Sequence, residues 1–417
     1  MDAPTSPRRF YIETLGCPKN QVDSDKLAGT LVADGMASVE DAAAADLVVV
    51  NTCAFIEEAR EESIETILAL AGAKRADAGL VVTGCLAERS GGELAEALPE
   101  VDGVVGFGVP VTLSRGPRSD LPDMDLLNLP RPRAAAPWAY VKVAEGCDRA
   151  CGFCAIPSFR GRQRSRAMAD VLDEIETLQV REVVLVAQDL AAYGRDQGRG
   201  RRRIVPLVAE AARRVPRVRL LYLYPSDLTD ELIATICATG VPYFDLSLQH
   251  VSRPLLRRMR RWGGGERFLE RIAAIRHREP DAAFRSNFIV GYPGETEDDH
   301  DLLLRFVDEA QLDWCGFFSY SEEAGTHSAT LDGKVPRTLA AERLAELRDR
   351  QDRITAARRG DLIGRSLEVL VDEPGIGRSH REAPEIDGVI AVPDGLAVGS
   401  FATVAVTGAA GPDLEAA

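Results

Sequence analysis

The sequence predicts an α/β protein with an N-terminal parallel α/β domain, a central partial (β/α)6 barrel of the TIM type and a small C-terminal β-barrel. Strand-like and helical stretches alternate up to about residue 350, which favours parallel, helix-covered sheets. Short strand-like runs separated by Gly/Pro turns follow, as is typical of a small barrel. A chain of 417 residues has room for two to three such domains. We expect them at residues 1–115, 134–350 and 358–417, with a linker at 116–133.

Composition narrows the class of protein before any motif is considered. The N-terminus is polar and rich in proline, and no apolar run approaches the roughly 20 residues of a membrane helix, so we expect no membrane partner. Eight cysteines without a secretory signal indicate a reducing cytoplasm and metal or redox chemistry rather than disulfides. The formal net charge of −15 argues against a general nucleic-acid binder and favours a basic partner.

In the N-terminal domain, each of three predicted strands is followed closely by a cysteine: Cys17, Cys53 and Cys85. The strands are residues 10–15, 47–50 and 80–83. The carboxyl ends of parallel strands lie along one edge of a sheet, where ligands bind, so we expect the three thiols to converge. They could hold an Fe–S cluster with one iron left unligated. The alternative is three small buried core thiols, which is less expected at three equivalent strand ends.

The central domain shows six strand-like runs that alternate with helical ones. The strands are expected at 138–143, 182–187, 218–223, 243–248, 284–290 and 314–319, with helices at 169–178, 229–238 and 297–310 among those between them. Six β/α units suggest a partial barrel, whose functional site should lie at the carboxyl ends of the strands.

Three cysteines follow the first of these strands in a C-x3-C-x2-C pattern: Cys147, Cys151 and Cys154. Thiolates this close in sequence can wrap one soft metal centre, and Fe–S clusters are held by such cysteines. Structural zinc ions and electron-carrying clusters normally have four protein ligands, so three leave one iron open. The alternative is a zinc site with a distant fourth ligand, although no Cys or His follows at the usual zinc spacing.

This segment resembles the cluster loop of the radical S-adenosylmethionine (SAM) enzymes. In that family the open iron binds SAM, and an electron from the cluster splits it into methionine and a 5′-deoxyadenosyl radical. The resemblance extends to an aromatic residue in the loop and to residues that follow the second, fourth and fifth strands, and it implies contacts with SAM. These residues are Phe153, Gln188, Gln249, Gly291 and Gly294. The glycines could equally form a plain turn, and the neighbouring His250 could be a hydrogen-bonded structural residue.

The N-terminal motifs narrow the resemblance to the methylthiotransferases, radical SAM enzymes with two 4Fe-4S clusters. The motifs are Leu15-Gly16-Cys17-Pro18-Lys19-Asn20, Asn51-Thr52-Cys53 and Thr83-Gly84-Cys85. Within that family, Cys-Pro-Lys-Asn resembles the ribosomal-protein branch (RimO-type), whereas the tRNA branch (MiaB-type) usually has Gln-Met or similar after the cysteine. The resemblance implies addition of a methylthio group to the β-carbon of one aspartate in the twelfth small-subunit ribosomal protein. The alternative is the same chemistry on a tRNA adenosine.

The C-terminal stretch supports a protein partner. A helix over about 340–357 precedes strands expected at 366–371, 388–392 and 402–406, and the segment resembles a TRAM domain, a module that usually binds RNA in tRNA enzymes. From Asp361 onwards there are three basic and ten acidic residues, a net charge of −7, which should repel phosphates and attract a basic protein. A merely solvated acidic face is the simpler alternative.

Two further classes of function compete with this interpretation. An Fe–S electron-transfer protein would be expected to have four cysteines per site, and a simple radical methyltransferase would not need the second cysteine set. Cys237 and Cys315 are expected to be core thiols. No catalytic residue beyond the six cluster ligands is predicted, and the electron donor and sulfur source that the reaction needs as partners are not identified.

Overall fold

The computed structural model describes residues 7–111, 124–198 and 200–417. The chain forms two compact units, which are described separately. The first lies within Met1–Arg133, Glu145–Asp148 and Ala155–Arg166, and the second within Ala134–Ala144, Arg149–Cys154 and Ala167–Ala417. Among the described residues, no helix combines the length and the apolar character needed to cross a membrane.

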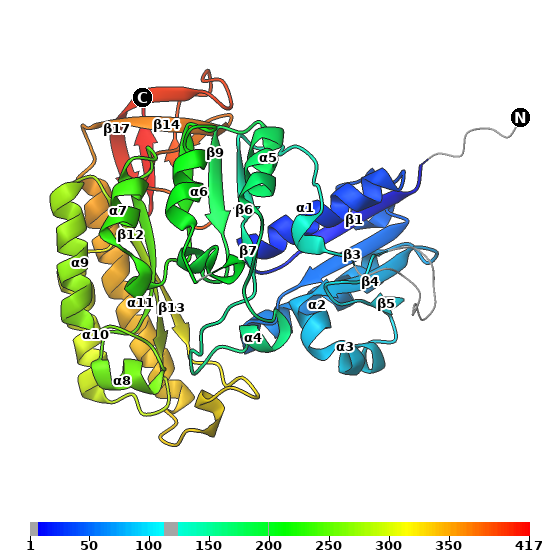
Figure 1. The fold of residues 1–417 in the computed structure, drawn as a ribbon, viewed down its shortest axis with the longest axis horizontal. Helices are drawn as coiled ribbons and strands as arrows, with labels where there is room; N and C mark the ends of the chain where they lie inside the picture. The colour runs from blue at the N-terminus through cyan, green and yellow to red at the C-terminus, as the bar shows by residue number, and fades with distance from the viewer. Residues whose placement is uncertain (1–6, 112–123, 199) are drawn as a thin grey trace, which may run out of the picture. The chain divides into compact units, whose positions relative to one another are not determined.

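The first unit is built on a parallel sheet with the strand order β2-β1-β3-β4-β5. Strands and helices alternate along the chain (Figure 1), which confirms the predicted parallel α/β domain. The strands are β1 (Arg9–Thr14), β2 (Ala37–Ser38), β3 (Leu47–Thr52), β4 (Gly79–Gly84) and β5 (Gly103–Val104), and the helices are α1 (Pro18–Ala33), α2 (Glu57–Ala73) and α3 (Cys85–Ala97).

Strand β3 lies in the middle of this sheet, and every one of its residues is buried. Successive side chains of a strand point to opposite faces. Val48 and Val50 therefore join the core that includes Ile67 of α2, while Leu47 and Val49 pack into the core on the α1 side. Because helices cover both faces, the carboxyl edge of the sheet is where a ligand can approach.

The stretch predicted to be a linker lies partly outside the described residues. Its later part packs within the first unit, where the backbone carbonyl of Leu127 accepts a hydrogen bond from Lys26 Nζ at 2.5 Å. Arg131 forms an ion pair with Asp25 at 2.8 Å. Both Leu126 and Leu127 are buried, so residues 124–131 are part of the N-terminal fold in addition to connecting it onwards.

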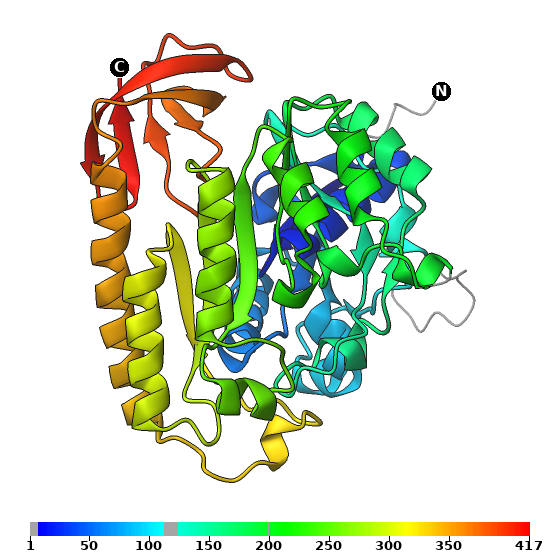
Figure 2. The ribbon, with the colours of Figure 1, turned by 60° about the vertical axis from the view of Figure 1, so that its left-hand side comes forward.

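The second unit contains the predicted six-stranded partial barrel, which is confirmed. Its strands form two three-stranded parallel sheets, β10-β9-β6 and β11-β12-β13, joined by a parallel bridge between Leu223 and Leu246. Helices lie along the outside of the strands (Figure 2). The strands are β6 (Trp138–Lys142), β9 (Glu182–Val186), β10 (Arg217–Leu220), β11 (Tyr243–Gln249), β12 (Ala283–Val290) and β13 (Trp314–Ser319). The helices are α5 (Met168–Leu178), α6 (Ile204–Ala211), α7 (Asp230–Cys237), α8 (Arg253–Arg258), α9 (Gly265–Arg278), α10 (Glu297–Ala310) and α11 (Arg337–Gly360). The short elements α4 (Ile156–Phe159) and β8 (Arg164–Ser165) belong to the first unit, and β7 (Ala144–Glu145) has one residue in each unit.

Apolar side chains on alternate strand positions explain how the helices attach. Val183 and Leu185 of β9 share one core with Val171 and Ile175 of α5, so this face of the strand is covered by helices. The intervening side chains point to the concave face of the sheet, and Glu182 is one of them. The partial barrel therefore has an apolar outer face and room for polar side chains inside.

The C-terminal module is a closed barrel of five strands in the order β14-β15-β16-β18-β17. They are β14 (Ser366–Glu373), β15 (Ile376–Arg378), β16 (Ile390–Ala391), β17 (Phe401–Ala410) and β18 (Asp413–Ala416). The predicted small barrel is confirmed, but the sequence indicated only three strands. It missed β15 and β18 because both are short and lack an alternating run of β-branched residues, and barrel pairing rather than local preference makes them strands.

The segment from residue 379 to 387, called the docking loop here, packs onto the amino-terminal end of the partial barrel. Its backbone carbonyls accept hydrogen bonds from Tyr140 (to Pro384, 2.9 Å), Arg219 (to His380, 2.9 Å) and Trp314 (to Arg381, 2.8 Å). Asp387 accepts from Tyr243 at 2.6 Å and pairs with Arg285. These barrel residues, with Glu182, come from all six strands: β6, β9, β10, β11, β12 and β13.

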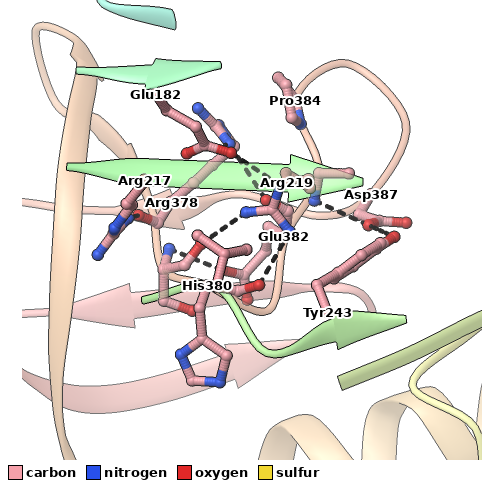
Figure 3. A network of polar contacts seen from close by, with 12 residues as sticks. Glu182, Arg217, Arg219, Tyr243, Arg378, His380, Glu382, Pro384 and Asp387 are labelled. Carbon is pink, nitrogen blue, oxygen red and sulfur yellow. Dashed lines mark hydrogen bonds and ion pairs between the residues drawn. The ribbon is translucent and has the colours of Figure 1, made fainter. Parts of the chain in front are cut away.

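Buried charges hold this contact together, as Figure 3 shows around Glu182. Glu182 pairs with Arg219 at 2.7 Å and with Arg378 at 3.4 Å, and all three side chains are at most 2% exposed. Glu382 of the docking loop pairs with Arg359 and accepts from Ser379 at 2.6 Å. Because unpaired buried charges are very costly, such a network holds one arrangement of loop and barrel.

Candidate functional site

The three strand-end cysteines of the first unit lie close together. Cys17 directly precedes α1 after β1, Cys53 follows β3 and Cys85 begins α3 after β4, and these three strands are neighbours in the sheet. A Cβ on Gly16, the residue before Cys17, would lie 2.8 Å from Cys53 Sγ, and Cys85 Sγ lies 3.6 Å from Oδ1 of Asn20 in the first turn of α1. The structure thus brings together, at the carboxyl edge, the thiols that the sequence predicts to converge.

Side-chain hydrogen bonds fix the loops that carry these thiols. Asn20 Nδ2 donates to the backbone carbonyls of Leu15 (2.8 Å) and Thr52 (3.0 Å), so one amide joins the first two cysteine loops. Ser63 Oγ accepts from the backbone N–H of Cys53 at 3.1 Å and donates to its carbonyl at 3.0 Å. The site is therefore held by groups that no local motif rule would have selected.

Two glycines beside the cysteines are required by their backbone and surroundings. Gly16 has φ of 94°, and a Cβ there would lie 2.8 Å from Cys53 Sγ. Gly84 has φ of 93°, and a Cβ there would lie 2.3 Å from Asn51 Oδ1. Both positions combine left-handed backbone with close packing, so a larger residue would displace Cys53 itself at Gly16 and the loop that leads to Cys53 at Gly84.

Burial and nearby cations act in opposite directions on the three thiols. Burial raises the pKa of Cys53 to about 12, and it also raises the pKa of Cys85 against the charge of Arg160. Burial acts the same way on Cys17, but the charges of Lys19 and Arg160 outweigh it, so the pKa of Cys17 lies below its ordinary value. A bound metal would favour the thiolate in all three.

Arg160 is a component of this site that the sequence interpretation missed. Its guanidinium donates to Cys85 Sγ from Nη2 at 3.1 Å and from Nε at 3.4 Å, and to Asn20 Oδ1 at 2.6 Å. The residue follows the C-x3-C-x2-C motif by six positions, and nothing in its immediate sequence distinguishes it from a surface arginine. Only the fold places it against the cysteines.

The residues of the C-x3-C-x2-C motif are held through their backbones. In the first unit, the N–H of Cys147 donates to the carbonyl of Gly161 at 3.1 Å. In the second unit, the N–H of Cys154 donates to the carbonyl of Cys151 at 3.2 Å. Arg261 Nη1 donates to Cys151 Sγ at 3.1 Å and is another site residue that the sequence did not reveal.

A charged cluster lies in the second unit next to this motif. Arg149 pairs with Asp189, which follows β9, at 2.6 Å, and also with Asp227. Its guanidinium lies 3.8 Å from the ring centre of Tyr224. Burial raises the pKa of Asp189 although Arg149 opposes it. The cluster orients the chain after the second strand, where Gln188 is expected to contact SAM.

The remaining residues expected to contact SAM lie at carboxyl ends of strands or in the cysteine loop. Gln249 ends β11 with φ of 71°, and Phe153 packs partly buried against the barrel core. Gly291 has φ of 80° and donates its N–H to Glu295 at 2.6 Å, and Gly294 has φ of 86° and donates to the carbonyl of Gly333 at 2.7 Å. A tight turn thus accounts for both glycines, and their contact with SAM stays a prediction.

His250 and the two other cysteines have structural surroundings. The Nδ1 atom of His250 accepts from the backbone N–H of Ser252 at 3.1 Å, and burial lowers the pKa of this histidine to about 4. Cys237 and Cys315 pack against the barrel core, and burial raises the pKa of both thiols. All three have the environment of core residues.

The donor set fits an Fe–S cluster better than a single ion. In the part of the chain that the structure describes, no group of three His, Cys, Asp or Glu side chains is placed to hold one metal ion. A cluster spans more space, because each of its irons takes its own cysteine thiolate. The site in the first unit offers three soft sulfur donors and buried N–H groups directed at sulfur, which is the environment such clusters require.

Comparisons with known proteins identify the parts of the chain. Residues 9–106 match the profile described as "Uncharacterized protein family UPF0004", residues 141–307 match "Radical SAM superfamily" and residues 363–417 match "TRAM domain". A solved structure of the radical SAM methyltransferase TsrM from Kitasatospora setae, with cobalamin and a [4Fe-4S] cluster bound, is similar with a TM-score of 0.50. It is 16% identical and covers 94% of this chain and 84% of that chain, so the likeness is one of fold.

Curated relatives are similar over nearly the whole length. The ribosomal protein uS12 methylthiotransferase RimO of Kineococcus radiotolerans is 42% identical, covering 99% of this chain and 98% of its own. The RimO of Moorella thermoacetica is 43% identical, covering 96% of each. Identity at this level over full-length chains establishes the family. The chain belongs to the RimO family of methylthiotransferases and is a radical SAM enzyme that works with S-adenosylmethionine and [4Fe–4S] clusters.

Proposed function

We propose that this enzyme adds a methylthio group to the β-carbon of one aspartate in ribosomal protein uS12. The relatives that match over the full length carry this protein in their names. The observation that carries the proposal is the presence of two separate three-cysteine sets in one chain. A β-carbon–hydrogen bond is beyond the reach of a side-chain base near neutral pH, so the hard step belongs to a radical cofactor.

We assign Cys147, Cys151 and Cys154 to the cluster that cleaves SAM, and Cys17, Cys53 and Cys85 to the auxiliary cluster. When bound, the clusters and SAM supply the radical, the sulfur and the methyl group. The chain supplies ligands for the clusters and contacts for SAM. For the SAM contacts we propose Phe153, Gln188, Gln249, Gly291 and Gly294. An electron donor and a sulfur source are required as further partners, and a ribosomal substrate would place the reaction in the cytoplasm.

The charge of the C-terminal barrel supports a basic protein as substrate. Of its three arginines, Arg378 and Arg381 are buried, and Arg365 pairs with Asp281 at 2.9 Å. Seven of its ten acidic residues are exposed, namely Asp361, Glu368, Glu373, Glu385, Asp394, Asp413 and Glu415. The exposed charged side chains of residues 361–417 are therefore seven acidic groups and one arginine, so nearly all of the module's net charge of −7 lies on its solvent-facing surface. Such a surface attracts a basic chain and repels phosphates.

Reversing charges on this surface should weaken binding of uS12. The variant Glu373→Lys/Asp394→Lys changes two exposed residues of the barrel, and we expect about tenfold weaker affinity at low ionic strength, with a smaller difference at high salt. Fluorescence titration of labelled uS12 at several salt concentrations measures this. The matched control, Glu61→Lys/Glu62→Lys, makes the same charge change on exposed positions of α2. Equal weakening by both variants would contradict a specific role for the barrel.

The substrate is tested directly by offering both candidates. The protein is reconstituted anaerobically with iron and sulfide, supplied with SAM and a reductant, and incubated with uS12 and tRNA in parallel. Mass spectrometry locates any methylthio group. Methylthio-aspartate on uS12 is the expected product, and methylthio-adenosine in tRNA would keep the chemistry but overturn the substrate.

A further inference from the structure

Arg160 is a buried cation with anionic groups on two sides. Its side chain is 3% exposed, and the ring of Phe107 lies 4.4 Å from the guanidinium carbon. Nη1 pairs with Glu145 at 2.8 Å and with Asp23 at 3.2 Å. All of these residues belong to the first unit. Because a buried charge is costly without partners, these contacts hold the guanidinium in one position.

The two edges of the guanidinium have different partners, which suggests a function beyond structure. On one side, Nη1 donates to the carboxylates of Glu145 and Asp23. The opposite edge, Nε and Nη2, is directed at Cys85 Sγ and Asn20 Oδ1. Hydrogen bonds to the sulfur ligands, together with net charge, are the means by which a protein sets the reduction potential of an Fe–S cluster.

The same short segment also holds the turn that leads into the other cysteine set. Gly161, the residue after Arg160, accepts the backbone N–H of Cys147, and Glu145 lies two positions before that cysteine. Gly146 has φ of 75°, and a Cβ there would lie 2.2 Å from the carbonyl oxygen of Arg162. Arg160 therefore lies in a tightly packed segment: its side chain contacts Cys85, and the backbone of the next residue, Gly161, contacts Cys147.

We propose that Arg160 is a positioning residue of the auxiliary cluster: it donates two N–H groups to the Cys85 sulfur and places its guanidinium between that sulfur and the carboxylates of Glu145 and Asp23, which makes the cluster's reduction potential less negative than it would be without the arginine. This inference rests on the ligand assignment made above for Cys17, Cys53 and Cys85. Arginine suits the role because its guanidinium remains protonated at any physiological pH. A less negative potential makes reduction of the auxiliary cluster easier and thereby affects how electrons distribute between the two clusters.

The test isolates one cluster in the full-length chain. Cys147, Cys151 and Cys154 are all replaced by alanine, so that only the auxiliary cluster is reconstituted, and its midpoint potential is measured by redox titration followed by EPR. Adding Arg160→Gln should shift the potential to a more negative value, and Arg160→Lys should shift it less because the charge is kept. An unchanged potential with Arg160→Gln, at full iron content, would overturn the proposal.

Two controls separate this effect from general damage. Arg131 is another buried arginine of the first unit and pairs with Asp25, which carries none of the cysteines' hydrogen bonds described above, so Arg131→Gln should leave the potential unchanged. An equal shift in that variant would overturn the proposal. If Arg160→Gln fails to bind iron, Arg160→Lys decides: a shifted potential supports the role, and the wild-type potential contradicts it. If the parent variant without Cys147, Cys151 and Cys154 binds no iron, the ligand assignment itself is wrong. Failure of the enzyme to modify uS12 would contradict the proposed function but would not change the measured potentials.

Discussion

Replacement of Cys151 by alanine is expected to abolish reductive cleavage of SAM. Three cysteines are the minimum that holds a [4Fe–4S] cluster with one open iron, so losing one of them removes the site at which SAM is activated. The measurement is anaerobic formation of 5′-deoxyadenosine after addition of reductant, quantified by chromatography. We expect no product above background, and formation at the wild-type rate would show that the C-x3-C-x2-C motif does not perform this step.

The other cysteines provide the matched controls for this experiment. Cys53→Ala should keep SAM cleavage but stop the formation of the methylthio product, because Cys53 belongs to the other set. Methylthio product from the Cys53 variant would contradict the auxiliary role. Cys315→Ala removes a thiol that packs against the barrel core and should leave both reactions at nearly wild-type rates in protein that remains folded.

Replacement of Glu182 by glutamine is expected to destabilise the second unit by about 3–5 kcal/mol, because it leaves buried arginines without their shared counter-charge. Glu182 pairs with Arg219 and Arg378, and the charge of Arg217 also acts on it. Urea-induced unfolding followed by circular dichroism measures the loss. The control is Glu176→Gln, which breaks an exposed pair with Arg214 and should cost less than about 1 kcal/mol. Similar losses for both variants would mean that the buried network contributes no more than a surface pair.

The same carboxylate gives this contact a predictable pH dependence. Burial alone would raise the pKa of Glu182, but the charges of Arg219, Arg378 and Arg217 outweigh it and lower the pKa below the ordinary value of 4.5. A group with a lowered pKa in the folded state contributes its stability above its unfolded pKa and loses it as the pH falls through the folded value. The stability difference between wild type and Glu182→Gln should therefore be full at neutral pH and shrink below about pH 4.5.

Much of the fold could be predicted because its signals are local. Buried parallel strands require continuous apolar runs, and Leu47 to Val50 is such a run. The convergence of Cys17, Cys53 and Cys85 follows from topology once the strands are known to be parallel. Local sequence therefore determines both the strands and the thiols at their ends.

The parts that could not be predicted depend on contacts between distant residues. Arg160 reaches Asn20 across 140 positions, and Arg378 reaches Glu182 across 196. No periodicity marks an arginine that will be buried, since the same residue is usually solvated on a surface. The strands β15 and β18 were missed for a related reason, because their neighbours in the closed barrel supply the hydrogen bonds that define them.

The docking loop has a consequence for how this enzyme can be divided or recombined. A chain cut after α11 would lose the carbonyls and carboxylates that now satisfy Arg219, Arg285 and Trp314 inside the partial barrel. A loss of activity in such a truncated chain would then reflect damage to the partial barrel as well as weaker binding of the substrate. A chimera that exchanges C-terminal modules between family members would need to exchange the matching barrel side chains together with the loop. A boundary for engineering should therefore not be placed at the end of α11, because the docking loop has to stay together with the strands of the partial barrel that bind it.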